Sequence, residues 1–324
     1  MPKGTTLSGK FWTVAPAALA YFRPPSVPPH RPFRLVVEDP TVGPIALSGA
    51  LHAPLGARTL VVALHGLGGS ADSSYMRQFA TAALAAGHAC LRLNHRGAER
   101  AAQDYYHAGL TVDLESVLAA EELARFERVA VVGFSLGGHV ALRYAAERPA
   151  ATDPRLAGVA AVCAPLDLER GATALDAPAS WLYRRYVLPG LQQHVDAVEK
   201  LRPVPCDRRR RARVRGIREW DDLVVAPRWG FASAEDYYAR ASVAPILDRI
   251  ALPAWIIESR NDPMVPVWTL EAALAGVSPT TEVTWTPRGG HVGMPRDLDL
   301  GQPGPRGLHA QLLAWLRAKL GAPA

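Results

Sequence analysis

The stretch "RVAVVGFSLGGHVALRYAAE" (residues 128–147) passes from an apolar run, through a glycine-rich turn, into a helical pattern. The run of valines and alanines predicts a buried strand, and the amphipathic spacing after it predicts a helix. Ser135 lies between Gly133 and Gly137 at this changeover, in the pattern G-x-S-x-G. A strand that turns so sharply into a helix holds its serine in strained backbone and needs small residues on both sides. Ser135 is therefore a candidate nucleophile, and the alternative is a purely structural turn.

A base for Ser135 is expected elsewhere in the chain, because a serine hydroxyl is a poor nucleophile until its proton is removed. Ten histidines are available, and "RGGHVG" (residues 288–293) places His291 in a glycine-flanked loop between the last predicted strand and the last predicted helix. In a doubly wound sheet such a loop emerges at the carboxyl edge, where Ser135 is also expected. His291 is therefore the predicted general base.

An acid that orients this histidine is expected in the loop after the preceding strand, in "AWIIESRNDPMVP" (residues 254–266). Glu258 lies within that strand or at its end, whereas Asp262 lies in the Asn-Asp-Pro turn beyond it. From the turn, a carboxylate can reach the far nitrogen of His291. Asp262 is therefore the predicted third member, and the alternative is a simple turn-forming aspartate.

Backbone N–H groups that could stabilise an oxyanion are predicted at two positions. The helix that begins after the serine offers its positive end and the N–H of Leu136. The turn "LHGLGGS" (residues 64–70), directly after the first long predicted strand, can offer the N–H of Leu67. Removing one such donor typically lowers the rate by ~10²–10³.

The same glycine-rich turn also matches a dinucleotide-binding fingerprint, with Gly66, Gly68 and Ala71 between a predicted strand and a predicted helix. That interpretation expects an acid at the end of the next strand, where "LRLNHRG" (residues 91–97) has none. It also leaves the serine, histidine and aspartate unexplained. The sequence therefore predicts no cofactor, and the three cysteines lack the spacing of a metal site or a disulfide framework.

Apolar runs alternate with helical patterns along most of the 324 residues. Six buried strands are predicted at 60–66, 89–97, 128–135, 156–165, 253–259 and 282–287. Helices are predicted at 76–86, 110–125, 136–147, 267–276 and 307–321, and an antiparallel edge hairpin at 33–39 and 43–53. Such alternation is typical of an α/β fold with a mostly parallel, doubly wound sheet that has helices on both faces.

The predicted domain organisation is an N-terminal arm at 1–34 and one domain at 35–324. The alternation breaks between about 166 and 245, which is too long for a plain loop and predicts a helical insertion that acts as a lid. The arm is expected to pack against the domain. Residues 1–20 also allow the alternative of a signal peptide and export, but a proline within the apolar stretch and the widely spaced cysteines favour a cytoplasmic location.

The net charge of +6 is concentrated in one segment, Arg208–Arg218, which holds seven arginines and no acid. Without these seven charges the net charge falls from +6 to −1. We interpret the segment as solvated and basic, with peripheral contact to anionic lipid as the alternative. No aromatic platform or nucleic-acid motif accompanies it, so binding to nucleic acid is not expected.

Taken in order, "LHGLGGS", "LNHRG", "GFSLGGH", "SAEDYYARASVAPILDRIALPAWIIESRNDPMVP" and "RGGHVG" resemble the YheT-like branch of the α/β-hydrolases (AB hydrolase family 4). The resemblance runs from about residue 35 to the end and implies the charge-relay residues Ser135, Asp262 and His291. It also implies hydrolysis of carboxylic esters, including lipid esters. His139 departs from the pattern, where asparagine is expected, and so does His95, where an aromatic residue is commoner.

The sequence therefore predicts an α/β-hydrolase fold with a nucleophile elbow and a serine esterase that acts on a small-molecule or lipid ester. A thioesterase or acyltransferase would use the same residues, because the pocket walls choose the acceptor and the leaving group. A ligand-binding homologue without catalysis is the alternative of a different class. The sequence does not specify the oligomeric state.

Overall fold

The computed structural model describes residues 7–22, 25–101, 103–147 and 152–320. Its centre is an eight-stranded sheet in the order β1-β2-β4-β3-β5-β6-β7-β8. The strands are β1 (Arg31–Asp39), β2 (Gly43–His52), β3 (Thr59–Leu64), β4 (Ala89–Leu93), β5 (Arg128–Phe134), β6 (Leu156–Val162), β7 (Ala254–Ser259) and β8 (Thr281–Thr286). All the predicted strands are confirmed, with ends that differ by a few residues.

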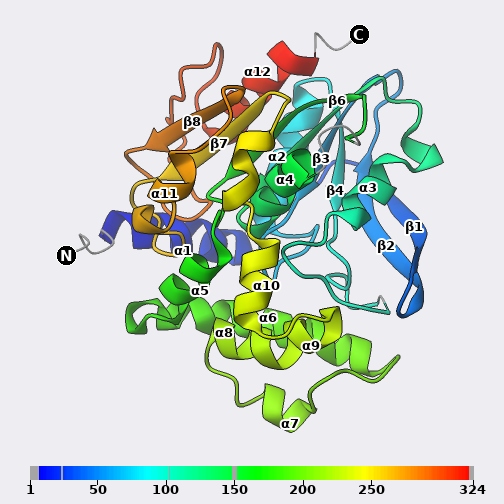
Figure 1. Cartoon of the computed structure of the whole chain (residues 1–324). Coiled ribbons are helices and arrows are strands. Elements are labelled where there is room, and N and C mark those ends of the chain that lie inside the picture. The colour runs from blue at the N-terminus through cyan, green and yellow to red at the C-terminus, as the bar shows by residue number, and fades with distance from the viewer. Residues whose placement is uncertain (1–6, 23–24, 102, 148–151, 321–324) are drawn as a thin grey trace.

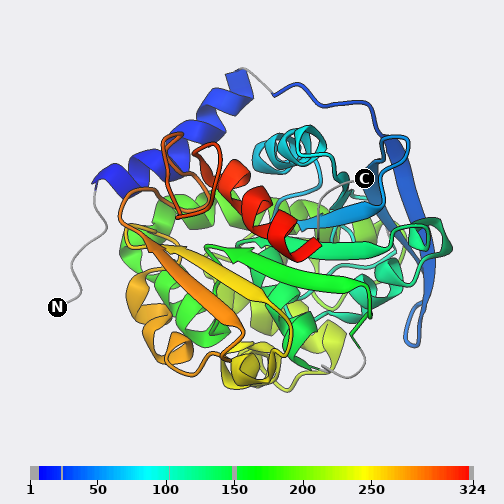
Figure 2. The same ribbon diagram turned by 90° about the horizontal axis from the view of Figure 1, so that it is seen from above.

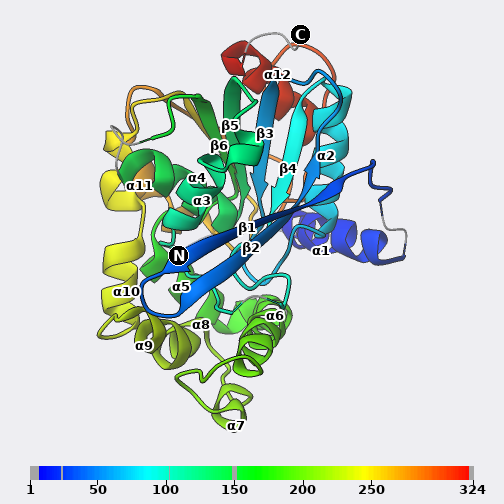
Figure 3. The same cartoon turned by 90° about the vertical axis from the view of Figure 1, so that its right-hand side faces the viewer.

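The sheet is parallel from β4 to β8, and β1 and β2 form an antiparallel hairpin at one edge. Figure 3 shows this hairpin crossing in front of the other strands. The central strands β3 and β5 are apolar and buried almost throughout, because helices cover both of their faces. The parallel strands therefore end at one common edge, which carries the loops of the candidate site.

Helices cover the two faces of the sheet (Figure 2). One face packs against α2 (Ser74–Ala85) and α12 (Leu308–Leu320), and the other against α3 (Val112–Leu118), α4 (Leu136–Glu147) and α11 (Glu271–Leu274). Two predicted helices are shorter than expected. The helix predicted at 110–125 ends at Leu118 and is followed by a 3-10 turn at Glu121–Leu123, while 267–276 forms a 3-10 turn at Val267–Thr269 and then α11.

The region between β6 and β7 contains helices but no strand among its residues, all of which the structure describes. They are α5 (Leu168–Asp176), α6 (Trp181–Glu199), α7 (Arg208–Arg211), α8 (Ile217–Trp220), α9 (Ala226–Trp229) and α10 (Ala234–Ala241), with 3-10 turns at Pro178–Ser180 and Ala244–Arg249 and a π-helical turn at Asp221–Val225. Figure 1 shows these helices below the sheet, beyond the carboxyl ends of its parallel strands. They have their own apolar core, which includes Val195, Trp220 and Tyr238.

The N-terminal segment forms a helix, α1 (Leu7–Phe22), which contains Pro16. Figure 2 shows α1 at the rim of the molecule, outside the helices that cover the sheet. Residues 1–6, which belong to the alternative signal peptide, and residues 23–24 of the predicted arm lie outside the described residues. Among the described helices, none has the length and apolar character that crossing a bilayer requires.

Candidate active site

Ser135 occupies a sharp turn between β5 and α4, and its φ of 53° lies in the left-handed region. The glycines on either side are required by close packing. A Cβ atom at Gly133 would lie 2.1 Å from the carbonyl oxygen of Gly137, and one at Gly137 would lie 2.4 Å from that of Leu64. The Ser135 N–H donates to the carbonyl of Val162 at 2.8 Å, which ties the turn to the neighbouring strand. The local sequence thus holds the hydroxyl outward at the sheet edge.

The structure brings Ser135, His291 and Asp262 into one chain of hydrogen bonds. His291 Nε2 lies 2.9 Å from Ser135 Oγ, and His291 Nδ1 lies 2.8 Å from Asp262 Oδ2. The other oxygen, Asp262 Oδ1, accepts the backbone N–H groups of Met264 and Val265 at 2.8 and 2.9 Å. A tautomer with its proton on Nδ1 satisfies both bonds, because Nδ1 then donates to the carboxylate and Nε2 accepts from the hydroxyl. We call these three residues the candidate triad.

The loop of His291 is held by α1, a contact that the sequence analysis missed. The backbone N–H of His291 donates to Thr13 Oγ1 at 2.8 Å, and Thr13 Oγ1 donates to the carbonyl of Gly9, also at 2.8 Å. A Cβ atom at Gly290 would lie 2.2 Å from that same carbonyl, and one at Gly293 would lie 1.9 Å from a carbonyl of α1. The helix therefore packs directly on the backbone around the histidine. No motif signals this contact, since it joins segments nearly 280 positions apart.

α1 also reaches the loop of Asp262. A Cβ atom at Gly9 would lie 1.9 Å from the carbonyl oxygen of Asn261, the residue before the aspartate. Asn261 in turn donates from its side-chain amide to the carbonyl of Pro287 at 2.7 Å, which joins the two loops. One helix thus contacts the loops of both the acid and the base.

Glu258, the second acid considered at this strand end, points into the protein interior. Its Oε1 accepts the N–H of Ala164 at 2.8 Å, and its Oε2 has no hydrogen-bond partner among the described residues. Burial raises the pKa of Glu258 well above its ordinary value, and the charge of Asp262 adds to this. Glu258 thus bonds to the backbone of Ala164, whereas Asp262 contacts the imidazole of His291 directly.

One group of side chains in the described part of the chain has the spacing of metal ligands: Cys163, Asp262 and His291. Two of its members already bond to each other through Asp262 Oδ2 and His291 Nδ1. Burial raises the pKa of the Cys163 thiol well above its ordinary value, which disfavours the thiolate that a metal requires. The chemistry of this set fits the hydrogen-bonded pair better than a metal ion, and the absence of a metal stays a prediction.

The glycine-rich turn after β3 leaves one amide available. The N–H groups of Gly66 and Gly68 each donate at 2.9 Å to a tyrosine hydroxyl, those of Tyr75 and Tyr106 respectively. The N–H of Leu67 has no acceptor among the described residues. Leu67 also lines the cavity described below, so its amide is available to a ligand there.

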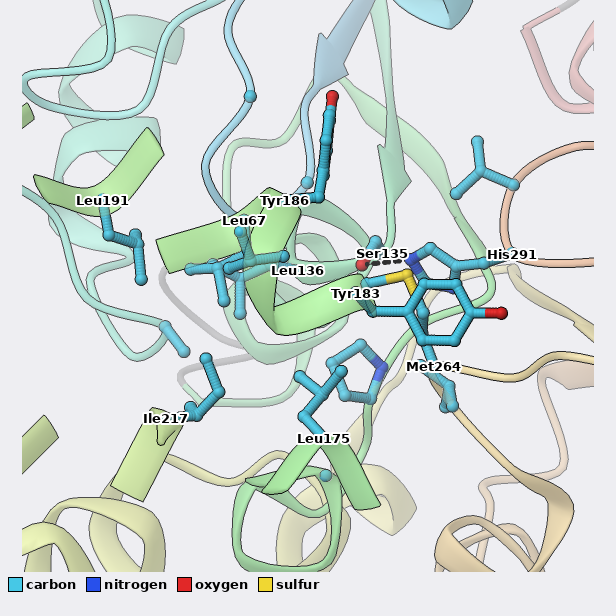
Figure 4. A pocket seen from close by; sticks show the side chains of 18 of the residues that line it. Leu67, Ser135, Leu136, Leu175, Tyr183, Tyr186, Leu191, Ile217, Met264 and His291 are labelled. Atoms are coloured by element: carbon cyan, nitrogen blue, oxygen red, sulfur yellow. Dashed lines mark hydrogen bonds between the residues drawn. The ribbon is translucent and has the colours of Figure 1, made fainter. Parts of the chain in front are cut away.

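Leu136 follows the serine as the first residue of α4, where a backbone N–H has no intrahelical acceptor. Leu136, Leu67 and Ser135 all line the same cavity (Figure 4). A Cβ atom at Gly66 would lie 3.0 Å from that of Ser135, so the glycine-rich turn packs against the serine. This arrangement argues against the dinucleotide interpretation, because the turn faces the serine.

A cavity of about 810 Å³ adjoins the candidate triad. Ser135 and His291 form part of its wall, and most of the remaining lining is apolar or aromatic (Figure 4). The lining from the helices between β6 and β7 includes Leu175, Tyr183, Tyr186, Leu191 and Ile217. Asp221 is a polar residue in this wall, and it accepts a hydrogen bond from Tyr238 Oη at 2.7 Å. Burial raises the pKa of Asp221 to about 7.

The two histidines that depart from the family pattern have structural contacts. His139 is buried, with its ring nitrogens 2.7 and 2.9 Å from the carbonyl oxygens of Pro165 and Ala241. It therefore joins α4 to the end of α10. His95 packs edge-on against His65, and its Nε2 lies 2.9 Å from the His65 carbonyl oxygen. Burial lowers the pKa of His95 to about 4.

The arginine-rich segment Arg208–Arg218 is partly neutralised by acids. Arg211 is buried and pairs with Asp196 at 2.8 Å and Glu199 at 2.6 Å. Arg208 also pairs with Asp196, at 3.2 Å, and Arg218 contacts two glutamates. Four of its arginines are exposed and form no side-chain ion pair with an acid among the described residues: Arg209, Arg210, Arg213 and Arg215, of which Arg215 donates to backbone carbonyls. Much of this segment is therefore built into the helical region.

The sequence model of the Alpha/beta hydrolase family matches residues 61–300. The protein named Putative esterase YheT from Escherichia coli (strain K12) is 32% identical over 241 residues, which cover 72% of this chain and 69% of that protein. The chain belongs to the YheT-like branch of the α/β-hydrolase family. The predicted fold and the resemblance are both confirmed.

More distant relatives have lipase and esterase names. Human Phospholipase ABHD3 is 25% identical over 241 residues, or 73% of this chain, and the match spans 58% of its own length. A solved structure, the Pyrococcus furiosus esterase Pf2001, superposes with a TM-score of 0.52 at 19% identity and covers 82% of this chain and 84% of its own. The chain is therefore a hydrolase, and its relatives include proteins named as esterases and lipases.

Proposed function

We propose that this α/β-hydrolase is a serine hydrolase that cleaves carboxylic esters through the candidate triad. The observation that carries the proposal is the unbroken chain of hydrogen bonds from Ser135 Oγ through His291 to Asp262. It ends in the wall of a cavity, where a substrate carbonyl can approach the hydroxyl. A structural turn would not need a serine that bonds to an imidazole in this way.

The reaction has two halves. Ser135 Oγ attacks the ester carbonyl while His291 Nε2 takes the hydroxyl proton, and the N–H groups of Leu67 and Leu136 stabilise the oxyanion. Collapse of this intermediate breaks the ester bond, and His291 returns the proton to the departing alcohol. Water then attacks the acyl-enzyme with His291 as base, which releases the acid and restores Ser135. Asp262 holds the imidazole in the required tautomer throughout.

We infer that the substrate is a hydrophobic acyl ester, such as a lipid ester. The size and apolar lining of the cavity support this, since apolar pockets of 300–1,000 Å³ are typical for small ligands. The names of the relatives, a phospholipase and an esterase among them, point the same way. The segment at about 166–245 would act as a lid on a single domain at 35–324, with residues 1–34 as an arm packed against it.

Peripheral contact of Arg208–Arg218 with anionic lipid is the alternative to a solvated segment, and Arg209, Arg210 and Arg213 are the exposed arginines that could make it. The proposed location is the cytoplasm. Three free, buried cysteines are compatible with a reducing compartment.

Covalent labelling tests the proposal most directly. We expect a fluorophosphonate probe to add one adduct to the wild-type chain and none to Ser135→Ala, as measured by intact-mass analysis. A panel of 4-nitrophenyl esters and matched thioesters then tells an esterase from a thioesterase. If wild type and variant are both unlabelled while a fatty acid still binds, the chain is a ligand-binding homologue and the proposal is wrong.

A further inference from the structure

Exposed large apolar side chains gather on two helices of this molecule, α1 and the first half of α6. The described residues include twelve such side chains, and eight of them lie there. These eight are Leu7, Phe11, Val14, Leu19, Phe22, Trp181, Leu182 and Tyr186. Single exposed apolar residues are common, but a gathered patch of this kind on a folded protein marks an interaction surface.

The helix α1 has its apolar face on the outside. Leu7, Phe11 and Val14 follow helical spacing, so they share one face, and Leu7 is 88% and Phe11 59% exposed. The opposite face contains Gly9 and Thr13, which pack against the loops of the candidate triad. A surface helix of a globular protein normally has the reverse arrangement, with its apolar stripe inward. The large side chains of α1 therefore lack the burial that usually accounts for them.

This apolar surface borders the opening of the cavity. Val14 from α1 and Leu182 and Tyr186 from α6 line the cavity and are also exposed at the surface. Figure 4 shows Tyr186 with its hydroxyl directed away from Ser135 and His291. The neighbouring Trp181 is 57% exposed. Part of the cavity rim is therefore formed by apolar side chains of two helices.

The charges on these two helical segments have one sign. Residues 7–22 contain Lys10 and no acid, and residues 181–190 contain Arg184 and Arg185 and no acid. Lys10 and Arg185 are exposed, whereas Arg184 donates to backbone carbonyls. An apolar face with cations beside it is complementary to an anionic lipid surface, where aromatic rings enter the headgroup region and cations meet the phosphates.

We propose that Leu7, Phe11, Val14, Trp181 and Tyr186 form a docking face that binds an anionic lipid surface. Docking in this way turns the cavity opening toward the lipid, so a lipid ester can enter without crossing water. Only this orientation effect rests on the proposed function, since binding to the surface needs no hydrolysis. The docking face is separate from the arginine-rich segment, which begins at α7, at the end of the helical region farthest from the sheet (Figure 1).

Flotation with lipid vesicles tests the docking face. The full chain carrying Ser135→Ala is mixed with phosphatidylglycerol or phosphatidylcholine vesicles, so that no hydrolysis alters the membrane. We expect the parent to bind phosphatidylglycerol vesicles. Adding Leu7→Ser, Phe11→Ser and Trp181→Ser should lower this binding at least about tenfold, since each change removes apolar area that docking would bury in the lipid. The matched control adds Val36→Ser and Leu55→Ser, which are exposed apolar residues elsewhere, and should bind like the parent.

The charge component has its own variant, Lys10→Glu with Arg185→Glu, which should weaken binding to phosphatidylglycerol and leave binding to phosphatidylcholine unchanged. Equal binding by the triple variant and the control would overturn the proposal, and so would a parent chain that does not float. Sedimentation velocity tests whether a second copy of the chain covers the docking face instead of lipid. A parent dimer that the triple variant abolishes would also overturn the proposal. The triple variant in the wild-type background should hydrolyse a short soluble ester normally, which separates failed docking from failed catalysis.

Discussion

The serine and the histidine of the candidate triad are held in different ways. Ser135 lies in a turn whose supports are its own strand and helix, together with the adjoining strands of the sheet. His291 lies in a loop whose supports come from far along the chain, with Asp262 on its ring and Thr13 on its backbone. The first arrangement follows from a short motif, whereas the second exists only in the folded molecule. The two regions should therefore respond differently to substitution.

The largest effect is expected at the ring of His291. Asp262→Asn keeps the size of the side chain but can no longer stabilise the imidazolium or fix its tautomer, so kcat should fall by about 10⁴. Steady-state hydrolysis of a 4-nitrophenyl ester measures this. Asp299→Asn, at an exposed aspartate in the loop between β8 and α12, is the control. Its kcat should stay within twofold of the wild-type value. A loss below about tenfold for Asp262→Asn would mean that another group orients the histidine.

The turn of Ser135 should be the more rigid of the two regions. Gly137→Ala would place a methyl group 2.4 Å from the carbonyl oxygen of Leu64, and backbone on both sides cannot give way. We expect activity to fall by about 10² or more and the thermal midpoint to drop by several degrees, because the turn and strand must shift. Gly276→Ala, where the nearest neighbour is 4.0 Å away, should change neither property. Unchanged activity in Gly137→Ala would show that the turn is looser than its packing indicates.

The contact from α1 should have a smaller, specific effect. Thr13→Val removes the acceptor for the His291 N–H and leaves the shape nearly unchanged, so kcat should fall about tenfold with KM within twofold. Thr13→Ser restores the hydroxyl and should recover most of the activity. Equal thermal midpoints for both variants would separate positioning of the histidine from a general loss of stability. If Thr13→Val has the activity of the wild type, α1 does not position the loop.

This difference also explains what the sequence could predict. The strands, the elbow at Ser135 and the order of the three candidate residues follow from local patterns, since each depends on a few neighbouring positions. The contact of Thr13 with His291 could not be found in this way, because its helix has no capping or catalytic signature and contains Pro16. The helix predicted at 267–276 is likewise replaced by a 3-10 turn at Val267–Thr269 and the short α11.

The charges of the helical region show the same limit. Composition alone predicts that Arg208–Arg218 is a uniform basic segment, yet Arg211 is buried against two acids of α6. Those acids lie 12 and 15 positions away, so no charge count within the segment could reveal the pairing. Local sequence thus predicted which candidate residues lie together better than it predicted what surrounds them.

The smallest effect on activity is expected at Glu258, the acid that shares a strand end with Asp262. Because burial raises its pKa well above the ordinary value, Glu258 holds its proton to a higher pH in the folded chain than in the unfolded chain, and Glu258→Gln should keep activity within about threefold. The sign of its effect on stability follows from proton binding. Above about pH 4.5 the unfolded chain releases this proton and the folded chain keeps it, so the wild type loses stability as pH rises.

Glutamine cannot titrate, and its side-chain oxygen can still accept the N–H of Ala164. The stability of Glu258→Gln relative to wild type should therefore increase between pH 5 and pH 8, as measured by urea denaturation of both proteins at both pH values. Other titrating groups are common to the two proteins and cancel in the difference. An equal difference at both pH values would mean that Glu258 is ionised in the folded state. Two carboxylates would then be ionised at the end of β7, and the assignment of a single orienting acid would have to be revised.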